Sequence, residues 1–112
     1  MNDKTGQAVG ARIEEMVRRI VASFAPERVI LFGSHARGEA GPDSDIDLLV
    51  VLDGPLKRRE KRVAIRTVLH GIGTAKDIVV VTPEEVNAQK DLPGSIVRPA
   101  LLEGRVLYER PA

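Results

Sequence analysis

The 112-residue chain has no cysteine, no tryptophan and only two histidines. Without cysteine there is no disulfide, no thiolate nucleophile and no cysteine-based zinc site, and two histidines are too few for a histidine-rich metal centre. Any bound metal would therefore have oxygen ligands. Seventeen Lys and Arg against sixteen Asp and Glu leave a formal charge of +1, so no overall field favours duplex nucleic acid or an anionic membrane.

The sequence also lacks long apolar runs. None approaches the ~20 residues of a membrane-spanning helix, and the N-terminus lacks the basic, apolar and small-residue pattern of a signal peptide. These features favour the cytoplasm. An apolar share of 43% with 29% charged residues is typical of a soluble globular protein, and the length fits one domain. We expect residues 1–7 to be a flexible terminus and residues 8–110 to form that domain.

Hydrophobic periodicity predicts alternating helices and strands. Apolar residues recur at helical spacing from Val9 to Phe24, where Pro26 ends the helix. Apolar runs predict buried strands, of which 46–52 is central because it is apolar without alternation. The strands are expected at 28–32, 46–52, 77–82 and 105–108, and further helices at 59 or 60 to 71 or 73, after a Thr82 capping box, and at 95–103. This order predicts an α/β (α+β) fold, a small mixed sheet flanked by helices.

Two aspartates open the second predicted strand. Asp45 and Asp47 are two residues apart, so they share one face of a strand with α-carbons ~6.6–7 Å apart. Carboxylates this close repel each other and raise each other's pKa unless a cation or basic group neutralises them. With oxygen ligands and no nearby cysteine, the favoured cations are Mg2+ and Mn2+.

A glycine–serine turn precedes these aspartates. Gly33 allows the backbone to approach a ligand closely, and Ser34 offers a hydroxyl and an N–H at the start of a short predicted helix, Ser34–Arg37. An anion-binding turn joined by one loop to paired carboxylates is what phosphoryl or nucleotidyl transfer from a metal–nucleotide requires. Asp77 opens the third strand in the same way, and a suitable register would bring it beside the pair.

Other phosphate-binding motifs do not fit. Gly33 and Gly38 have the spacing of a P-loop, but Glu39 and Ala40 stand where Lys and Ser or Thr must follow, and no G-x-G-x-x-G occurs. A Walker ATPase and a Rossmann dehydrogenase are therefore both disfavoured.

The string GSHARGEAGPDSDIDLLV, with Gly33-Ser34, ten residues and then Asp45-Ile46-Asp47, resembles the GSx10DxD signature of the DNA polymerase β-type nucleotidyltransferase superfamily. It is most similar to the minimal nucleotidyltransferase (MNT) branch, and the similarity covers nearly the whole chain. The resemblance implies that Asp45 and Asp47 bind Mg2+, that Asp77 completes a catalytic triad around two ions, and that Gly33 and Ser34 hold the triphosphate of ATP. It also implies a HEPN toxin as partner, with AMP transferred from ATP to a tyrosine of that toxin.

Two other functions stay open at this stage. One is a non-catalytic antitoxin that binds and occludes its toxin, against which the acidic triad counts. The other is a small-molecule nucleotidyltransferase completed by a separate helical subunit. A chain of 112 residues leaves no room for an acceptor-binding domain, which favours an acceptor brought by another protein.

Several polar residues have simpler interpretations. His35 is expected to be a loop residue without a partner, and Arg37 is more readily solvated than bound to phosphate. A basic cluster in the second long helix favours a solvated helix face over binding to nucleotide, RNA or an acidic partner. The cluster consists of Lys57, Arg58, Arg59, Lys61, Arg62 and Arg66.

Overall fold

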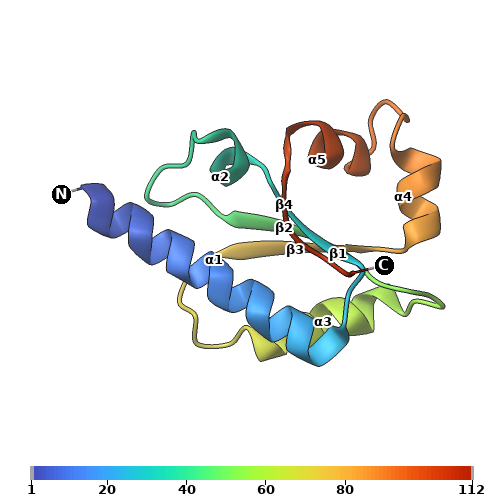
Figure 1. The fold of residues 1–112 in the computed structure, drawn as a ribbon, viewed down its shortest axis with the longest axis horizontal. Helices are drawn as coiled ribbons and strands as arrows, with labels where there is room; N and C mark the ends of the chain where they lie inside the picture. The colour runs from blue at the N-terminus through green and yellow to red at the C-terminus, as the bar shows by residue number, and fades with distance from the viewer. Residues whose placement is uncertain (1, 112) are drawn as a thin grey trace.

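The computed structural model describes the backbone of residues 2–111 and the side chains of residues 9–111. Its elements, in chain order, are α1 (Asn2–Phe24), β1 (Arg28–Phe32), α2 (Ser34–Arg37), β2 (Ile46–Val51), α3 (Arg58–Val68), β3 (Lys76–Val81), α4 (Pro83–Gln89), α5 (Val97–Glu103) and β4 (Arg105–Glu109). The strands form one sheet with helices on both faces (Figure 1). This confirms the expected α+β fold.

The sheet is mixed and has the strand order β3-β2-β1-β4. β1 pairs antiparallel with both β2 and β4, whereas β2 and β3 run parallel. β2 therefore lies inside the sheet, as its apolar sequence predicted. All of its residues are buried except Asp47, which is half-buried.

One face of the sheet is covered by α1 and α3 (Figure 1). The larger core cluster lies here and joins both helices to three strands. Its fully buried members include Met16 and Ile20 of α1, Leu48 and Val50 of β2, and Ile65 and Leu69 of the α3 region. Burial of these side chains supplies the main stabilisation of this layer, about 1.5–3 kcal/mol for each large aliphatic side chain.

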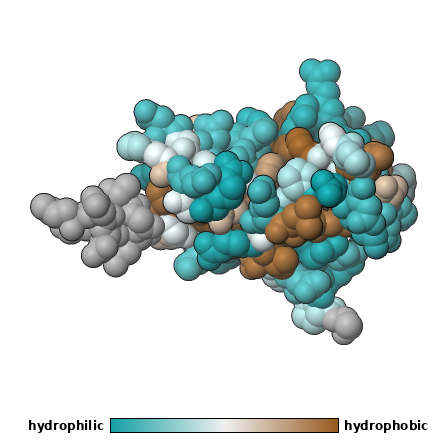
Figure 2. Space-filling model, turned by 90° about the horizontal axis from the view of Figure 1, so that it is seen from above, coloured by the Kyte–Doolittle hydropathy of each residue, from teal (hydrophilic) through white to brown (hydrophobic). Residues whose placement is uncertain are grey.

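The opposite face is covered by α4 and α5. A smaller cluster packs Leu49 and Val51 of β2 against Val86 of α4 and Val97 of α5. Both helices are short, and large apolar side chains of this region, among them Leu92, Ile96 and Leu102, are exposed. Viewed from the side of α2, α4 and α5, the surface accordingly shows hydrophobic areas among hydrophilic ones (Figure 2).

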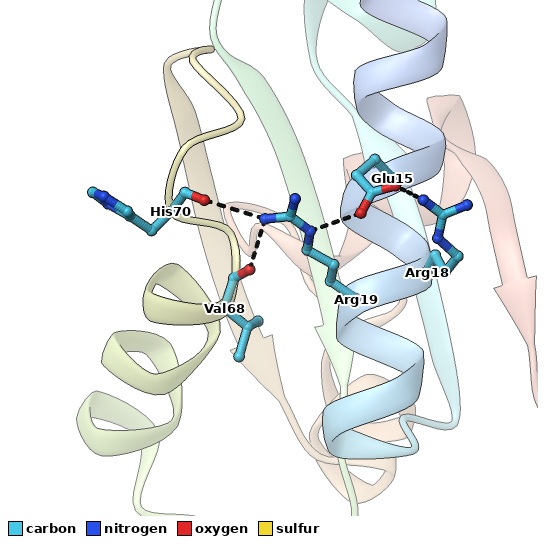
Figure 3. A network of polar contacts seen from close by, with 5 residues as sticks. All are labelled: Glu15, Arg18, Arg19, Val68 and His70. Carbon is cyan, nitrogen blue, oxygen red and sulfur yellow. Dashed lines mark hydrogen bonds and ion pairs between the residues drawn. The ribbon is translucent and has the colours of Figure 1, made fainter.

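Arg19 of α1 forms hydrogen bonds to the C-terminal end of α3. Its Nη1 donates to the carbonyl oxygens of Val68 and His70, each at 3.1 Å, and its Nε donates to Glu15 Oε2 at 2.7 Å (Figure 3). The carbonyls that end a helix have no partner within the helix. Arg19 therefore acts as a C-terminal cap delivered from a neighbouring helix.

Local sequence sets two other helix ends. Thr82 and Glu85 form the predicted capping box: Glu85 N–H donates to Thr82 Oγ1 at 3.1 Å, and Thr82 N–H donates to Glu85 Oε1 at 2.9 Å. α5 begins at Val97, within the stretch 95–103 that was expected to be helical, and Ser95 Oγ accepts the N–H of Arg98 at 3.1 Å. Pro99 therefore lies in the first turn, where its missing N–H costs nothing.

Several boundaries differ from the prediction. α1 begins at Asn2 rather than near Val9; the flexible terminus expected for residues 1–7 stays a prediction. α3 ends at Val68 and not at a glycine, because residues 69–72 form tight turns. Among the described residues, no helix has both the length and the apolar character needed to cross a bilayer.

Candidate active site

Asp47 and Asp77 face each other across the parallel strand pair. They are register partners on β2 and β3, where neighbouring strands lie about 4.8 Å apart. Side chains alternate along a strand, so Asp47 lies on the same face as Leu49 and Val51, the face covered by α4 and α5. The register that would bring Asp77 beside the second strand is thus present.

Asp45 lies just before β2. It is exposed, and the N–H of Ile46 after it donates to the carbonyl of Ala75 at 2.9 Å, which extends the β2–β3 ladder toward the loop. Asp45 therefore stands at the same end of the sheet as Asp47 and Asp77. The acidic end of the sheet is formed by these three residues.

Gly33 packs directly against the Asp47 carboxylate. Its backbone has φ 74° and ψ −156°, a region that is essentially restricted to glycine. A Cβ placed on Gly33 would collide with Asp47 Oδ2 and would lie 3.1 Å from Asp47 Cγ. Glycine is therefore required here both for the turn and for the contact with a carboxylate.

The glycine–serine turn and the short helix predicted after it are present as α2. The N–H groups of Ala36 and Arg37 donate to the Gly33 carbonyl at 3.1 and 3.2 Å, and Gly38 closes the turn in the left-handed conformation. Ser34 is half-buried. Within residues 9–111 its hydroxyl has no hydrogen-bond partner, so it is free to accept or donate to a ligand.

His35 is not the unpartnered loop residue that the sequence suggested. Its Nε2 lies 3.2 Å from the carbonyl oxygen of Ser44, the residue before Asp45. The loop is also closed on itself, since the N–H of Gly41 donates to Ser44 Oγ at 2.8 Å. α2 thus holds the loop that carries Asp45, a contact across nine residues that no local pattern indicates.

Arg37 is engaged by acidic side chains. Its Nε donates to Glu39 Oε1 at 2.7 Å, and its Nη1 lies 4.0 Å from Glu103 Oε2. The hydrogen bond to Glu39 raises the pKa of the Arg37 guanidinium further above its usual value. In this conformation Arg37 is paired with the carboxylates of Glu39 and Glu103.

The environment of Asp47 disfavours its charged form. Burial raises the pKa of the Asp47 carboxyl, and the negative charges of Asp77 and Asp45 raise it further. His35 and Arg37 oppose this effect more weakly. Such mutual repulsion is relieved when a divalent cation lies between the carboxylates, so the acidic end of the sheet has the charge and the donor type that fit Mg2+.

Asp77 has a basic neighbour that the sequence did not reveal. Arg66 of α3 places Nη2 3.8 Å from Asp77 Oδ1, and both side chains are half or more exposed. Among residues 9–111, no three Asp, Glu, His or Cys side chains are gathered closely enough to hold a metal. The structure thus pairs the two strand aspartates without a closed three-carboxylate cage. The roles of Asp45, Asp47, Asp77, Gly33 and Ser34 stay predictions.

A family model for the nucleotidyltransferase domain matches residues 12–106. The chain is also 34% identical over 99 residues to "Putative protein adenylyltransferase MJ0604" of Methanocaldococcus jannaschii, which covers 86% of this chain and 94% of that protein. The chain belongs to the nucleotidyltransferase domain family. As a nucleotidyltransferase, it carries its acidic strand pair and its glycine–serine turn inside the matched region.

Solved structures show the same fold for this nucleotidyltransferase. A crystal structure of "a putative nucleotidyltransferase" from Sulfolobus solfataricus superposes with a TM-score of 0.61 at 25% identity, covering 92% of this chain and 87% of that one. A toxin–antitoxin crystal structure with AMP-PNP also superposes with a TM-score of 0.61, at 20% identity, covering 87% and 73% of the two chains. At that identity the second comparison shows the fold alone.

Proposed function

We propose that this nucleotidyltransferase transfers AMP from Mg2+-bound ATP to a hydroxyl group of a partner protein. The observation that carries the proposal is the pairing of Asp47 with Asp77, with Gly33 packed against the Asp47 carboxylate. The relative named as a protein adenylyltransferase supports a protein as acceptor. Use of ATP also agrees with the cytoplasmic location expected from the sequence.

Each predicted site residue has a role in this reaction. Asp45 and Asp47 would hold Mg2+, Asp77 would share one of two ions, and Ser34 with the Gly33 backbone would bind the β- and γ-phosphates. When bound, Mg2+ neutralises phosphate oxygens and stabilises the charge that develops in the transition state. Mg2+ commonly uses one or two carboxylates together with phosphate oxygens, which the Asp47–Asp77 pair can supply.

The chemical step is a substitution at the α-phosphorus of ATP. The acceptor hydroxyl oxygen forms a new bond to the α-phosphorus, the bond between that phosphorus and the α–β bridging oxygen breaks, and pyrophosphate leaves. The hydroxyl proton passes to a base, for which Asp77 is the candidate because its side chain is 59% exposed and accessible to an acceptor. The products are the AMP ester of the acceptor and pyrophosphate.

The acceptor we propose is a tyrosine of a HEPN-family toxin, so that the protein acts as an antitoxin. This identity comes from the resemblance of the GSx10DxD string, and the toxin–antitoxin structure that shares the fold was solved with an ATP analogue. A HEPN partner would bring its own hydroxyl to the exposed acidic end of the sheet.

One assay tests the proposal. The protein is mixed with the product of its neighbouring gene, ATP and Mg2+, and intact mass spectrometry is used to detect an added AMP. We expect modification of the neighbour by the wild type and by Asp91→Asn, which changes an exposed aspartate outside the site, and none by Asp47→Asn. Tight binding without a mass change, unaffected by Asp47→Asn, would instead show occlusion. Transfer of AMP to a small molecule in place of a protein would instead indicate a small-molecule nucleotidyltransferase that a separate helical subunit completes.

A further inference from the structure

α3 carries a stripe of basic residues on its outer face. Arg59, Arg62, Val63 and Arg66 follow the spacing i, i+3, i+4, i+7, which places them on one side of a helix. All four are exposed, Val63 by 56%, while Ile65 and Leu69 point into the core. The α3 stripe, as we name these four residues, spans about 10 Å.

Charge is strongly segregated toward this helix. Residues 57–66 contain six basic side chains and one acidic one, which leaves eleven basic against fifteen acidic side chains in the rest of the chain. Although the net charge of the whole chain is only +1, residues 57–66 carry a formal charge of +5 and the rest of the chain carries −4. Such asymmetry favours binding of an anionic partner at the basic region.

Within residues 9–111, no carboxylate lies within ion-pair distance of Arg59 or Arg62. Two other members of the basic cluster are engaged: Arg58 is paired with Glu85, and Lys61 lies 5.9 Å from the centre of the Phe24 ring. Arg59 and Arg62 are therefore available to an external carboxylate, and the exposed Val63, next to Arg62 in the stripe, offers an apolar contact.

The stripe ends at the candidate active site. Arg66, its last member, lies 3.8 Å from Asp77, and Asp77 is the register partner of Asp47. A segment bound along α3 from Arg59 to Arg66 would therefore lead directly to the acidic end of the sheet.

We propose that the α3 stripe is the docking surface for an acidic, amphipathic segment of the acceptor protein. Glutamate or aspartate side chains of that segment pair with Arg59 and Arg62, and an apolar residue of the same segment covers Val63. The proposal rests on the proposed function for the identity of the acceptor. Arginine flanking an apolar contact is a frequent feature of protein interfaces, and complementary charge would speed the encounter and fix the register of the acceptor.

A nucleic acid fits the stripe less well than a protein. Neutralising several phosphates requires more cationic groups along a longer track than three guanidinium groups provide, and Val63 interrupts them. Proteins that bind single strands also stack bases on exposed aromatic rings. The chain has only three aromatic residues, Phe24, Phe32 and Tyr108, and all three are half-buried.

The test uses three labelled probes and fluorescence anisotropy. The first is a 20-residue helical peptide with glutamates around one central leucine, the second is the same peptide with lysine in place of glutamate, and the third is a 20-nucleotide single-stranded RNA. The variant is Arg59→Glu/Arg62→Glu, and Arg98→Glu, an exposed arginine of α5, is the matched control. Thermal unfolding with and without Mg2+ and ATP shows whether the variant is folded and still binds nucleotide.

We expect the acidic peptide to bind the wild type and Arg98→Glu in a salt-dependent manner and to bind the double variant about tenfold or more weakly. The lysine peptide should bind the double variant better than the wild type, and the nucleotide-induced shift should be unchanged. The proposal is overturned if both peptides bind the wild type equally, if the double variant binds the acidic peptide as the wild type does, or if RNA binds more tightly than the acidic peptide. Absence of a nucleotide shift in the wild type would contradict the proposed function and leave the peptide result standing.

Discussion

Asp47 and Asp77 each occupy the second position of a strand, and the two strands are parallel and in register. Parallel pairing places the starts of both strands at the same edge of the sheet, so the two carboxylates meet although thirty residues separate them. An antiparallel pairing of the same strands would have put them at opposite ends. The strand topology therefore creates the acidic end of the sheet.

The first prediction concerns ligand-linked stability. If Asp45, Asp47 and Asp77 hold Mg2+ with ATP, the two ligands together should raise the melting temperature of the wild type and have little effect on Asp45→Asn. A ligand present at a hundred times its dissociation constant stabilises the folded state by about 2.7 kcal/mol. Differential scanning fluorimetry measures the shift. Asp91→Asn should behave as the wild type, and equal shifts in Asp45→Asn and the wild type would exclude Asp45 as a ligand.

The second prediction concerns pH in the absence of metal. Burial and the charges of Asp77 and Asp45 raise the pKa of Asp47 in the folded protein. The stability associated with protonated Asp47 is then fully present below the usual aspartate pKa and is lost as the pH rises through the raised pKa of the folded state. With EDTA present, Asp47→Asn should therefore be more stable than the wild type at neutral pH.

Urea unfolding at neutral and acidic pH checks this prediction. The difference between Asp47→Asn and the wild type should shrink as the pH falls toward the usual aspartate range, because the wild-type carboxyl becomes neutral as well. If the difference in free energy of unfolding between the two proteins grew on acidification, the prediction would be contradicted. Addition of Mg2+ and ATP at neutral pH should reverse the order of the two proteins, because only the wild type keeps the carboxylate.

Much of the fold was predictable because the local signals agree with one another. The strand Arg28–Phe32 and the short helix Ser34–Arg37 have the predicted bounds. The Thr82 capping box is present because both of its hydrogen bonds are local. The sequence also singled out Asp77 as the residue that a suitable register would bring beside the second strand, and the parallel pairing provides that register.

Contacts between distant segments were not predictable in the same way. The contact of His35 with the Ser44 carbonyl and the ion pair of Arg66 with Asp77 depend on how the loop and α3 pack. No regular spacing in the sequence predicts either of these two contacts. The end of α3 was misplaced for the same reason, because Arg19 of α1 satisfies the carbonyls of Val68 and His70 from another helix.

The third prediction separates two roles of glycine. Gly33→Ala places a methyl group against the Asp47 carboxylate and forces a backbone region that costs about 1–3 kcal/mol. Gly38 also has a positive φ, 73°, but a methyl group at this position would meet no heavy atom within 4 Å. Gly38→Ala therefore incurs only the cost of the left-handed conformation, about 1–2 kcal/mol.

Both alanine variants should lower the melting temperature, and Gly33→Ala alone should abolish the shift caused by Mg2+ and ATP. The comparison isolates the contact with Asp47, because backbone strain is present in both. Loss of the nucleotide shift in Gly38→Ala to the same degree would show that turn strain, and not the Asp47 contact, governs binding.

The last prediction compares two neighbouring arginines of α1 that share Glu15 (Figure 3). Arg19→Ala removes the hydrogen bonds to the Val68 and His70 carbonyls and should lower the free energy of unfolding by about 1–2 kcal/mol, because charged donors to a helix end are stronger than neutral ones. Arg18 is 75% exposed and contacts only Glu15 among these groups, so Arg18→Ala should cost about 0.5 kcal/mol or less.

Urea unfolding of both variants, with Arg19→Lys as a third, measures the difference. Lysine keeps the charge but lacks the planar fork that serves Glu15 and both carbonyls at once, so it should recover only part of the loss. Equal destabilisation by Arg18→Ala and Arg19→Ala would mean that the ion pair with Glu15, and not the cap on α3, joins the two helices.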